Sequence, residues 1–362
     1  MTASRRWCAV AVATLALLAL PFAGRLVPVA DSDVSAAALL AQVNDSEGVA
    51  YSGFVESAGA LRLPVTDDFS GLAELLGEQS RLRVWWRGGQ DWRVDAIEPT
   101  GETDLIHSPA GTTIWEYESM QVTATVDPVI RLPRTADLLP PTLARLLLRG
   151  ADVSEVDRID ADRIAGRDAA GLRFRPSDNR SSVRHVDVWV DAASGLPVRV
   201  SLFGPGRVAA ITTSFLSLST EMPDAASTAF DPPPGADVRF DDVVDIAAAA
   251  DRFAPVEPPN RLAGLERRAR DGLGAVGQYG QGVTSIVAIP LRDETACALR
   301  DQMTATRGAR TTPVGTRVVV GPLALLLTPE GGDEDSAWLV GGTVTRQTLT
   351  TAARELAGSV RR

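Results

Sequence analysis

The side chains able to do acid–base or nucleophilic chemistry are few and widely separated in this sequence. The only two histidines, His107 and His185, have no cysteine or second histidine near them. Each lies in a segment that alternates like a β-strand, so we interpret both as ordinary strand residues. All 36 basic residues are arginine. This excludes a Schiff-base lysine, a P-loop lysine and a Ser-x-x-Lys nucleophile.

Three further motifs also fail to indicate a reaction. Asp187 and Asp191 flank Trp189 on one strand face, where paired carboxylates could exchange protons with a substrate, but we interpret them as surface acids. Cys297 is the only cysteine beyond the N-terminal segment, so no intramolecular disulfide is expected there. The glycine run at 272–277 has the spacing of a dinucleotide loop, but an arginine-rich stretch precedes it and a strand pattern follows it. We therefore predict no enzyme activity, no cofactor and no metal site.

The N-terminal segment has the pattern of an export signal. Arg5 and Arg6 precede an uncharged stretch from Trp7 to Gly24. This stretch is shorter than the roughly 20 apolar residues of a membrane-spanning helix. We expect residues 1–30 to be a signal peptide or an uncleaved anchor, with the rest secreted or held in the cell envelope. A net charge of −10 at pH 7 argues against nucleic acid as a partner.

The strongest structural signal is the stretch RLRVWWRGGQDWRVDAI, residues 81–97. Its apolar side chains recur at every second position and arginines occupy the places between, which predicts an antiparallel hairpin with one apolar face. Short strand patterns continue to about residue 126. A heavily apolar helix, LPPTLARLLLRG, follows at 139–150, and strands resume to about residue 218. The pattern predicts a large antiparallel sheet whose apolar face is covered by helices or by a ligand.

Proline-rich stretches divide the chain into two parts. We predict a large domain over residues 31–232, a linker with a short helix over 233–262, and a small α+β domain over 263–362.

A set of large apolar residues is predicted to line the space between sheet and helix. Its members are Leu82, Val84, Trp86, Trp92, Trp115, Tyr117, Leu139, Leu143, Leu146 and Leu147. The alternation places the sheet members on one face if its period holds. They form either a packed core or a cavity large enough for an acyl chain, and the pattern alone leaves both readings open.

Four stretches resemble a known family. They are RIAGRDAAGLRFRPSD at 163–178, VDVWVDAASGLPVRV at 186–200, YGQGVTSIVAI at 279–289 and WLVGGTVTRQTLTTAARELAGSV at 338–360. Together with the element order, they resemble the LolA-like superfamily and, within it, the RseB/MucB branch of sigma-E factor regulatory proteins. The all-arginine composition suggests a GC-rich, actinobacterial source.

The resemblance implies an α+β fold, in which a curved antiparallel LolA-like half-barrel under a helical lid precedes a smaller C-terminal domain. It also implies that the large domain binds acyl chains of a lipid or lipoprotein, and that the small domain contacts the extracytoplasmic part of a membrane anti-sigma factor. The alternative is a LolA-like carrier of lipids or lipoproteins without a regulatory partner. An enzyme acting on envelope substrates ranks last.

Overall fold

The computed structural model describes residues 29–63, 70–127, 130–240, 257–268, 273–329 and 336–359, together with Trp7, Thr14 and Ala250. The predicted export signal lies almost wholly outside these residues, as does the short helix predicted within the linker. Among the described residues, no helix is both long enough and apolar enough to cross a membrane.

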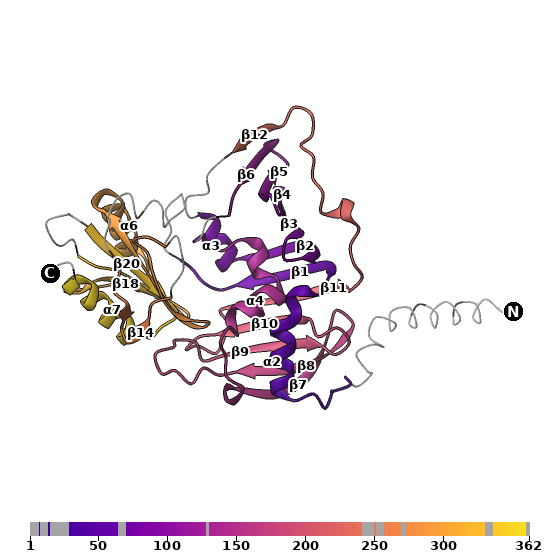
Figure 1. Cartoon of the computed structure of the whole chain (residues 1–362), viewed down its shortest axis with the longest axis horizontal. Helices are drawn as coiled ribbons and strands as arrows, with labels where there is room; N and C mark the ends of the chain where they lie inside the picture. The colour runs from indigo at the N-terminus through magenta and orange to yellow at the C-terminus, as the bar shows by residue number, and fades with distance from the viewer. Residues whose placement is uncertain are drawn as a thin grey trace.

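Within the described ranges, twelve strands form one long open sheet (Figure 1). Their order is β12-β6-β5-β4-β3-β2-β1-β11-β10-β9-β8-β7, and neighbours run antiparallel except for the parallel pair β12–β6. The bounds are β1 Tyr51–Gly59, β2 Gln79–Gly88, β3 Asp91–Glu98, β4 Gly101–Ser108, β5 Gly111–Glu116, β6 Gln121–Thr125, β7 Val156–Ile164, β8 Arg167–Phe174, β9 His185–Asp191, β10 Pro197–Phe203, β11 Ile211–Ser219 and β12 Asp237–Phe240. The sheet is not closed into a barrel, and the predicted α+β class with a large antiparallel sheet is confirmed.

The hairpin β2–β3 has the predicted alternation. Leu82 pairs with Ala96, Val84 with Val94, and Trp86 with Trp92. Paired residues in an antiparallel ladder project to the same face. These six side chains are buried on one face, which we call the inner face, while the arginines at 81, 83, 87 and 93 project to the opposite, outer face.

Helices cover the inner face of the β7–β10 half of the sheet (Figure 1). Helix α2, Ala36–Asp45, is capped by the Ser35 hydroxyl, which accepts from the Ala38 amide at 3.2 Å. Helix α4, Pro140–Leu147, begins with proline at its first position, where no intrahelical N–H partner is needed. The two helices pack against each other and against valines of β9 and β10. A short helix, α3 (Ser70–Gly77), packs against β1 and β2.

The smaller C-terminal part is built on a second antiparallel sheet. Within the described residues its order is β15-β16-β20-β19-β18-β17. Helix α7, Arg346–Ser359, packs on one face with Trp338, and helix α6, Asp293–Ala305, packs on the other face with Leu327. The strands are β15 Gly277–Gln281, β16 Thr284–Arg292, β17 Arg310–Thr312, β18 Gly315–Val320, β19 Leu323–Leu327 and β20 Ser336–Gly342, and a small ribbon of β13 (Arg261–Leu262) and β14 (Leu265–Glu266) lies beside them.

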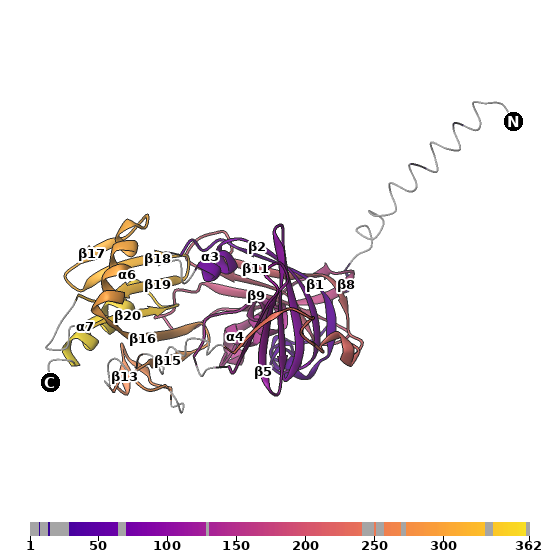
Figure 2. The ribbon, with the colours of Figure 1, turned by 90° about the horizontal axis from the view of Figure 1, so that it is seen from above.

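The connection between β8 and β9 joins the two parts (Figure 2). The Ser182 amide donates to the Thr343 carbonyl at 3.1 Å, and the Thr345 amide donates to the Arg180 carbonyl at 2.7 Å. The Arg180 guanidinium also donates to the Gly264 carbonyl at 2.6 Å. Backbone bonds of this kind fix the two sheets side by side.

The predicted linker, residues 233–262, is not uniform in structure. Four of its residues form β12 and extend the large sheet by one strand, and two more form β13 beside the small sheet. The boundaries 31–232 and 263–362 remain predictions for the extent of the two domains.

Adjacent tryptophans on opposite faces provide a test of the hairpin register. Trp86 is 6% exposed and lies between two rings, whereas its neighbour Trp85 is half-buried on the outer face. We expect Trp86→Ala to lower the free energy of unfolding in urea by about 3–5 kcal/mol. Trp85→Ala should cost less than half as much. Equal losses for the two variants would contradict the assignment of the faces.

Candidate functional site

A cavity of about 1120 Å³ lies between the inner face of the hairpin β2–β3 and the segments that lead into and out of α4. Its walls come from six separate stretches of the chain, including the end of α2 and one residue of the small sheet. The lining residues are Asn44, Glu47, Trp86, Gly89, Gln90, Trp92, His107, Asp127, Ile130, Arg131, Pro133, Ala136, Asp137, Thr142, Arg145, Leu146, Arg149, Gly150 and Gln278.

The floor of the cavity is part of a ladder of stacked rings across β1 to β4. Tyr51 lies 5.8 Å from Trp86, Trp86 lies 5.7 Å from Trp92, and Trp92 lies 5.1 Å from His107, with interplanar angles of 8°, 7° and 17°. The ladder follows from the register, because Tyr51 pairs with Trp86, Trp86 with Trp92, and Trp92 with His107. The Trp86 indole N–H also donates to the Glu47 carbonyl at 3.3 Å. These contacts give the cavity a flat, rigid apolar floor.

The helical side of the cavity is cationic. Arg145 donates to the Ser46 hydroxyl at 3.0 Å, and burial lowers the pKa of Arg145 despite the opposing effects of Tyr51 and Glu47. Arg149 is exposed at the rim. Among the described residues, neither arginine forms an ion pair with a carboxylate. The cavity therefore combines an apolar floor with two arginines that form no ion pair within the described ranges, beside Glu47 on the same wall.

A polar network closes the opposite side. His107 Nδ1 lies 2.9 Å from the Thr112 hydroxyl, which donates to Asp127 at 2.9 Å. Arg134 forms a 2.7 Å ion pair with Asp127 and donates to Thr112 at 3.1 Å. The network holds His107 through its Nδ1 atom, while Arg134 Nη2 contacts Asp127 as an ion pair without a hydrogen bond of good geometry.

Eight of the ten apolar candidates divide into three groups in the structure. Trp86, Trp92 and Leu146 line the cavity. Leu82, Val84 and Leu139 are fully buried in the core next to it. Leu143 and Leu147 pack in a second cluster with α2 and the strands β8 to β10, so at these two positions α4 is part of the packed core. Whether the cavity binds lipid remains a prediction.

The expectation that Trp115 and Tyr117 share the inner face is wrong. Trp115 pairs with Asp104, whose side chain projects to the outer face. Trp115 packs on that face with Val122 and Phe230. Tyr117 follows the end of β5 and is 65% exposed. The reason is that each turn sets the alternation anew, so spacing along the chain does not carry a face from one strand to the next.

The acidic pair on β9 is buried and not on the surface as expected. Asp187 is held by Arg173 through two bonds of 2.6 Å. Asp191 accepts from Arg167 at 3.0 Å and from Ser194. Each carboxylate is paired with its own arginine, and neither is among the residues that line the cavity described above. His185 lies 3.8 Å from Asp187 beside the same arginine.

Sequence reasoning missed the charged half of the cavity. It selected apolar positions, whereas Arg131, Arg145 and Arg149 supply much of the wall. A signal was available for Arg145, which interrupts the apolar run of the helix at 139–150 one residue before Leu146. The glycine run near 277 leads into strand β15, as the strand pattern after it predicted.

The fold can be compared with solved structures. No family model matches the sequence, and no curated protein sequence matches it. The complex structure of Pseudomonas aeruginosa MucA/MucB contains a chain that matches with a TM-score of 0.51 at 15% identity, over 88% of this chain and 96% of that chain. This chain has the MucB fold. A crystal structure of MucB in complex with MucA(peri) gives a TM-score of 0.48 at 16% identity, covering 88% and 97% of the two chains. The LolA superfamily protein NE2245 from Nitrosomonas europaea gives 0.26 at 11% identity, covering 54% and 98%.

The match covers 88% of this chain and therefore extends over both the large sheet and the small C-terminal sheet. The predicted resemblance in fold is therefore confirmed.

Protonation of His107 provides a test of the network beside the cavity. Burial lowers the pKa of His107 below its ordinary value, although Asp127 opposes this and Arg134 and Arg131 add to it. The unfolded chain then binds a proton more readily than the folded one, so stability falls as pH drops through about 6.5. We expect His107→Gln to lose less stability than the parent between pH 7.5 and pH 5 in urea unfolding.

His185 has a pKa shifted in the same direction, mainly by burial, and contributes separately. The matched variant His185→Gln should leave the His107 contribution in place. An unchanged pH dependence in His107→Gln would contradict the role of burial.

Proposed function

We propose that this chain is an extracytoplasmic regulator of the RseB/MucB kind. It binds the extracytoplasmic part of a membrane anti-sigma factor and takes an acyl chain of a lipid or lipoprotein into the cavity. The observation that supports this most strongly is the MucB fold across both parts of the chain. The solved MucB chain is in a complex with MucA, and the family that the sequence resembles pairs such a protein with an anti-sigma factor.

The cavity has the chemistry that an anionic amphiphile needs. The stacked rings of Trp86 and Trp92 offer a flat apolar surface for a hydrocarbon chain. Arg145 and Arg149 line the same cavity and would pair with a headgroup phosphate or carboxylate. The volume of about 1120 Å³ lies just above the roughly 300–1000 Å³ of usual small-molecule pockets. A ligand larger than a metabolite fits these features.

The predicted export signal supports a location outside the cytoplasmic membrane, where lipoproteins and the outer segments of anti-sigma factors are found. The small domain, predicted as residues 263–362, is the proposed docking unit for the anti-sigma factor. Lipid binding and partner binding would then be coupled, and each would change the affinity of the other by the same factor.

Substitutions at two leucines of α4 distinguish an acyl-chain cavity from a packed core. Leu146 is 46% exposed and lines the cavity, whereas Leu143 is 6% exposed within the second cluster. Leu146→Asp should leave thermal stability nearly unchanged and weaken binding of a fluorescent fatty acid by roughly tenfold, about 1.4 kcal/mol. Leu143→Asp buries an unpaired charge and should cost several kcal/mol of stability.

Titration of the labelled fatty acid into the parent and both variants gives the affinities, and thermal unfolding gives the stabilities. A parent protein without fatty-acid binding, or a Leu146→Asp variant that binds as well as the parent, would remove the acyl-chain part of the proposal.

The partner is tested with the full chain. A tagged form, expressed with its export signal and purified from detergent-solubilised membranes, should retain a single-span protein whose cytosolic part binds a sigma factor. Mass spectrometry identifies the retained proteins, and added fatty acid should reduce their recovery. Fatty-acid binding without any such protein would instead favour the carrier.

A further inference from the structure

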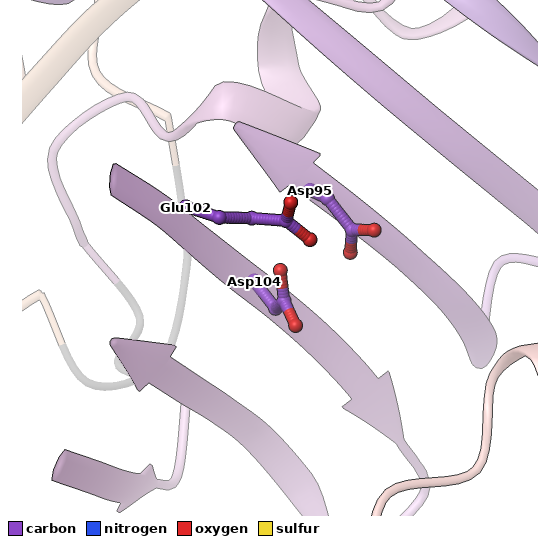
Figure 3. A group of neighbouring side chains, drawn as sticks. All are labelled: Asp95, Glu102 and Asp104. Atoms are coloured by element: carbon purple, nitrogen blue, oxygen red, sulfur yellow. The ribbon is translucent and has the colours of Figure 1, made fainter. Parts of the chain in front are cut away.

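A group of three carboxylates lies on the outer face of the hairpin β3–β4, on the far side of the sheet from the cavity. Asp95 pairs directly with Asp104 across the two strands, and Glu102 is the next residue on the same face of β4. One carboxylate oxygen from each side chain lies within 4.8 Å of the other two. Figure 3 shows the three carboxylates directed toward one another.

One arginine satisfies only part of this group. Arg93 donates to Asp95 Oδ1 and to Asp104 Oδ2, each at 2.6 Å. The other two oxygens, Asp95 Oδ2 and Asp104 Oδ1, are buried and have no hydrogen-bond partner among the described residues. Asp95 is 0% exposed and Asp104 is 3% exposed. An unpaired buried carboxylate oxygen is costly, so these two atoms require either a bound cation or a proton shared between Asp95 and Asp104.

The local charge is consistent with a divalent cation. Three ionised carboxylates against one guanidinium carry two negative charges, and burial together with Asp95 raises the pKa of Asp104 to about 7. Arg83 is opposite Asp95 in the register, but its guanidinium lies 5.4 Å from the Phe54 ring and 5.6 Å from the Trp85 ring and forms no ion pair within the described ranges. It therefore does not neutralise the group directly.

The donor set selects among metals. It consists of oxygens alone, which suits the hard cations Ca²⁺ and Mg²⁺ and not zinc, which prefers nitrogen and sulfur. The carboxylates are fixed by two paired strands, and Ca²⁺ tolerates such irregular geometry better than Mg²⁺, which demands a near-ideal octahedron. Glu102 is half-buried and gives the group its opening to solvent.

We propose that Asp95, Glu102 and Asp104 bind one Ca²⁺ ion on the outer face of the hairpin β3–β4. The ion joins the two strands whose inner face carries Trp92 and His107, so its binding stiffens the wall of the cavity. A site with three protein carboxylates and solvent access resembles extracellular Ca²⁺ modules, whose dissociation constants are roughly 10⁻⁴–10⁻³ M. The proposal does not depend on the identity of the lipid or of the protein partner.

Trp115 makes the site observable by luminescence. It pairs with Asp104 on the outer face, and Cβ atoms of such pairs lie about 4.5–5.5 Å apart. Tb³⁺ occupies Ca²⁺ sites and emits when a neighbouring indole transfers its excitation. In the EDTA-treated full-length protein at pH 8, excitation of tryptophan should give Tb³⁺ emission that added CaCl₂ displaces. Calorimetric titration with CaCl₂ should show one site.

Variants locate the ion. Glu102→Gln, which changes a half-buried side chain and should fold normally, is expected to weaken Ca²⁺ binding at least tenfold, and Asp104→Asn to abolish it. Trp115→Phe should reduce the Tb³⁺ emission while keeping the calorimetric affinity. Asp91→Asn is the matched control. Asp91 lies on β3, like Asp95, and forms an ion pair with Arg87 of β2, so this variant should bind Ca²⁺ like the parent.

Two results would overturn the proposal. The first is the absence of both binding heat and Tb³⁺ emission in the parent up to 10 mM ion; if Asp104→Asn is then more stable than the parent, Asp95 and Asp104 share a proton and bind no cation. The second is Glu102→Gln binding as tightly as the parent.

Discussion

The register of β1 to β4 is the constraint on which the rest of the large domain depends. It aligns Tyr51, Trp86, Trp92 and His107 into one stacked ladder on the inner face. Because side chains alternate, a slip of one residue would move the whole ladder to the outer face. The same register places Arg93 and its carboxylate partners on the outer face. One set of strand pairings therefore produces both the floor of the cavity and the acidic group behind it.

The sequence predicted the parts of this arrangement that arise within a hairpin. The alternation from residue 81 to 97 identified the strands, the faces and the buried tryptophans of β2 and β3. It failed at Trp115, because the number of residues in each turn decides how the alternation of one strand continues in the next. The acidic group was within reach of the same reasoning, since Asp95 and Asp104 can be paired by counting outward from the turn at Pro99 and Thr100.

The walls of the cavity could not be predicted in this way. They combine Glu47 after α2, Arg131 before α4, Arg145 within it and Gln278 of the small sheet. No local pattern links such distant residues, and only the packed fold brings them together. The role of α4 was likewise decided by its neighbour α2, which buries Leu143 and leaves Leu146 facing the cavity. What sequence suggested as a uniform apolar lid is a core helix with one leucine at the cavity and an arginine beside it.

In the proposed function, an acyl chain lies on the stacked rings of Trp86 and Trp92. Brominated fatty acids quench indoles that they contact, and Trp86 and Trp92 line the cavity, whereas Trp85 and Trp115 lie on the outer face. The measurement is tryptophan fluorescence of the full chain titrated with a brominated fatty acid, compared with the unbrominated acid. The account predicts saturable quenching in the parent that is largely lost in the double variant Trp86→Phe/Trp92→Phe. Quenching that is absent in the parent, or unchanged in the double variant, would contradict it.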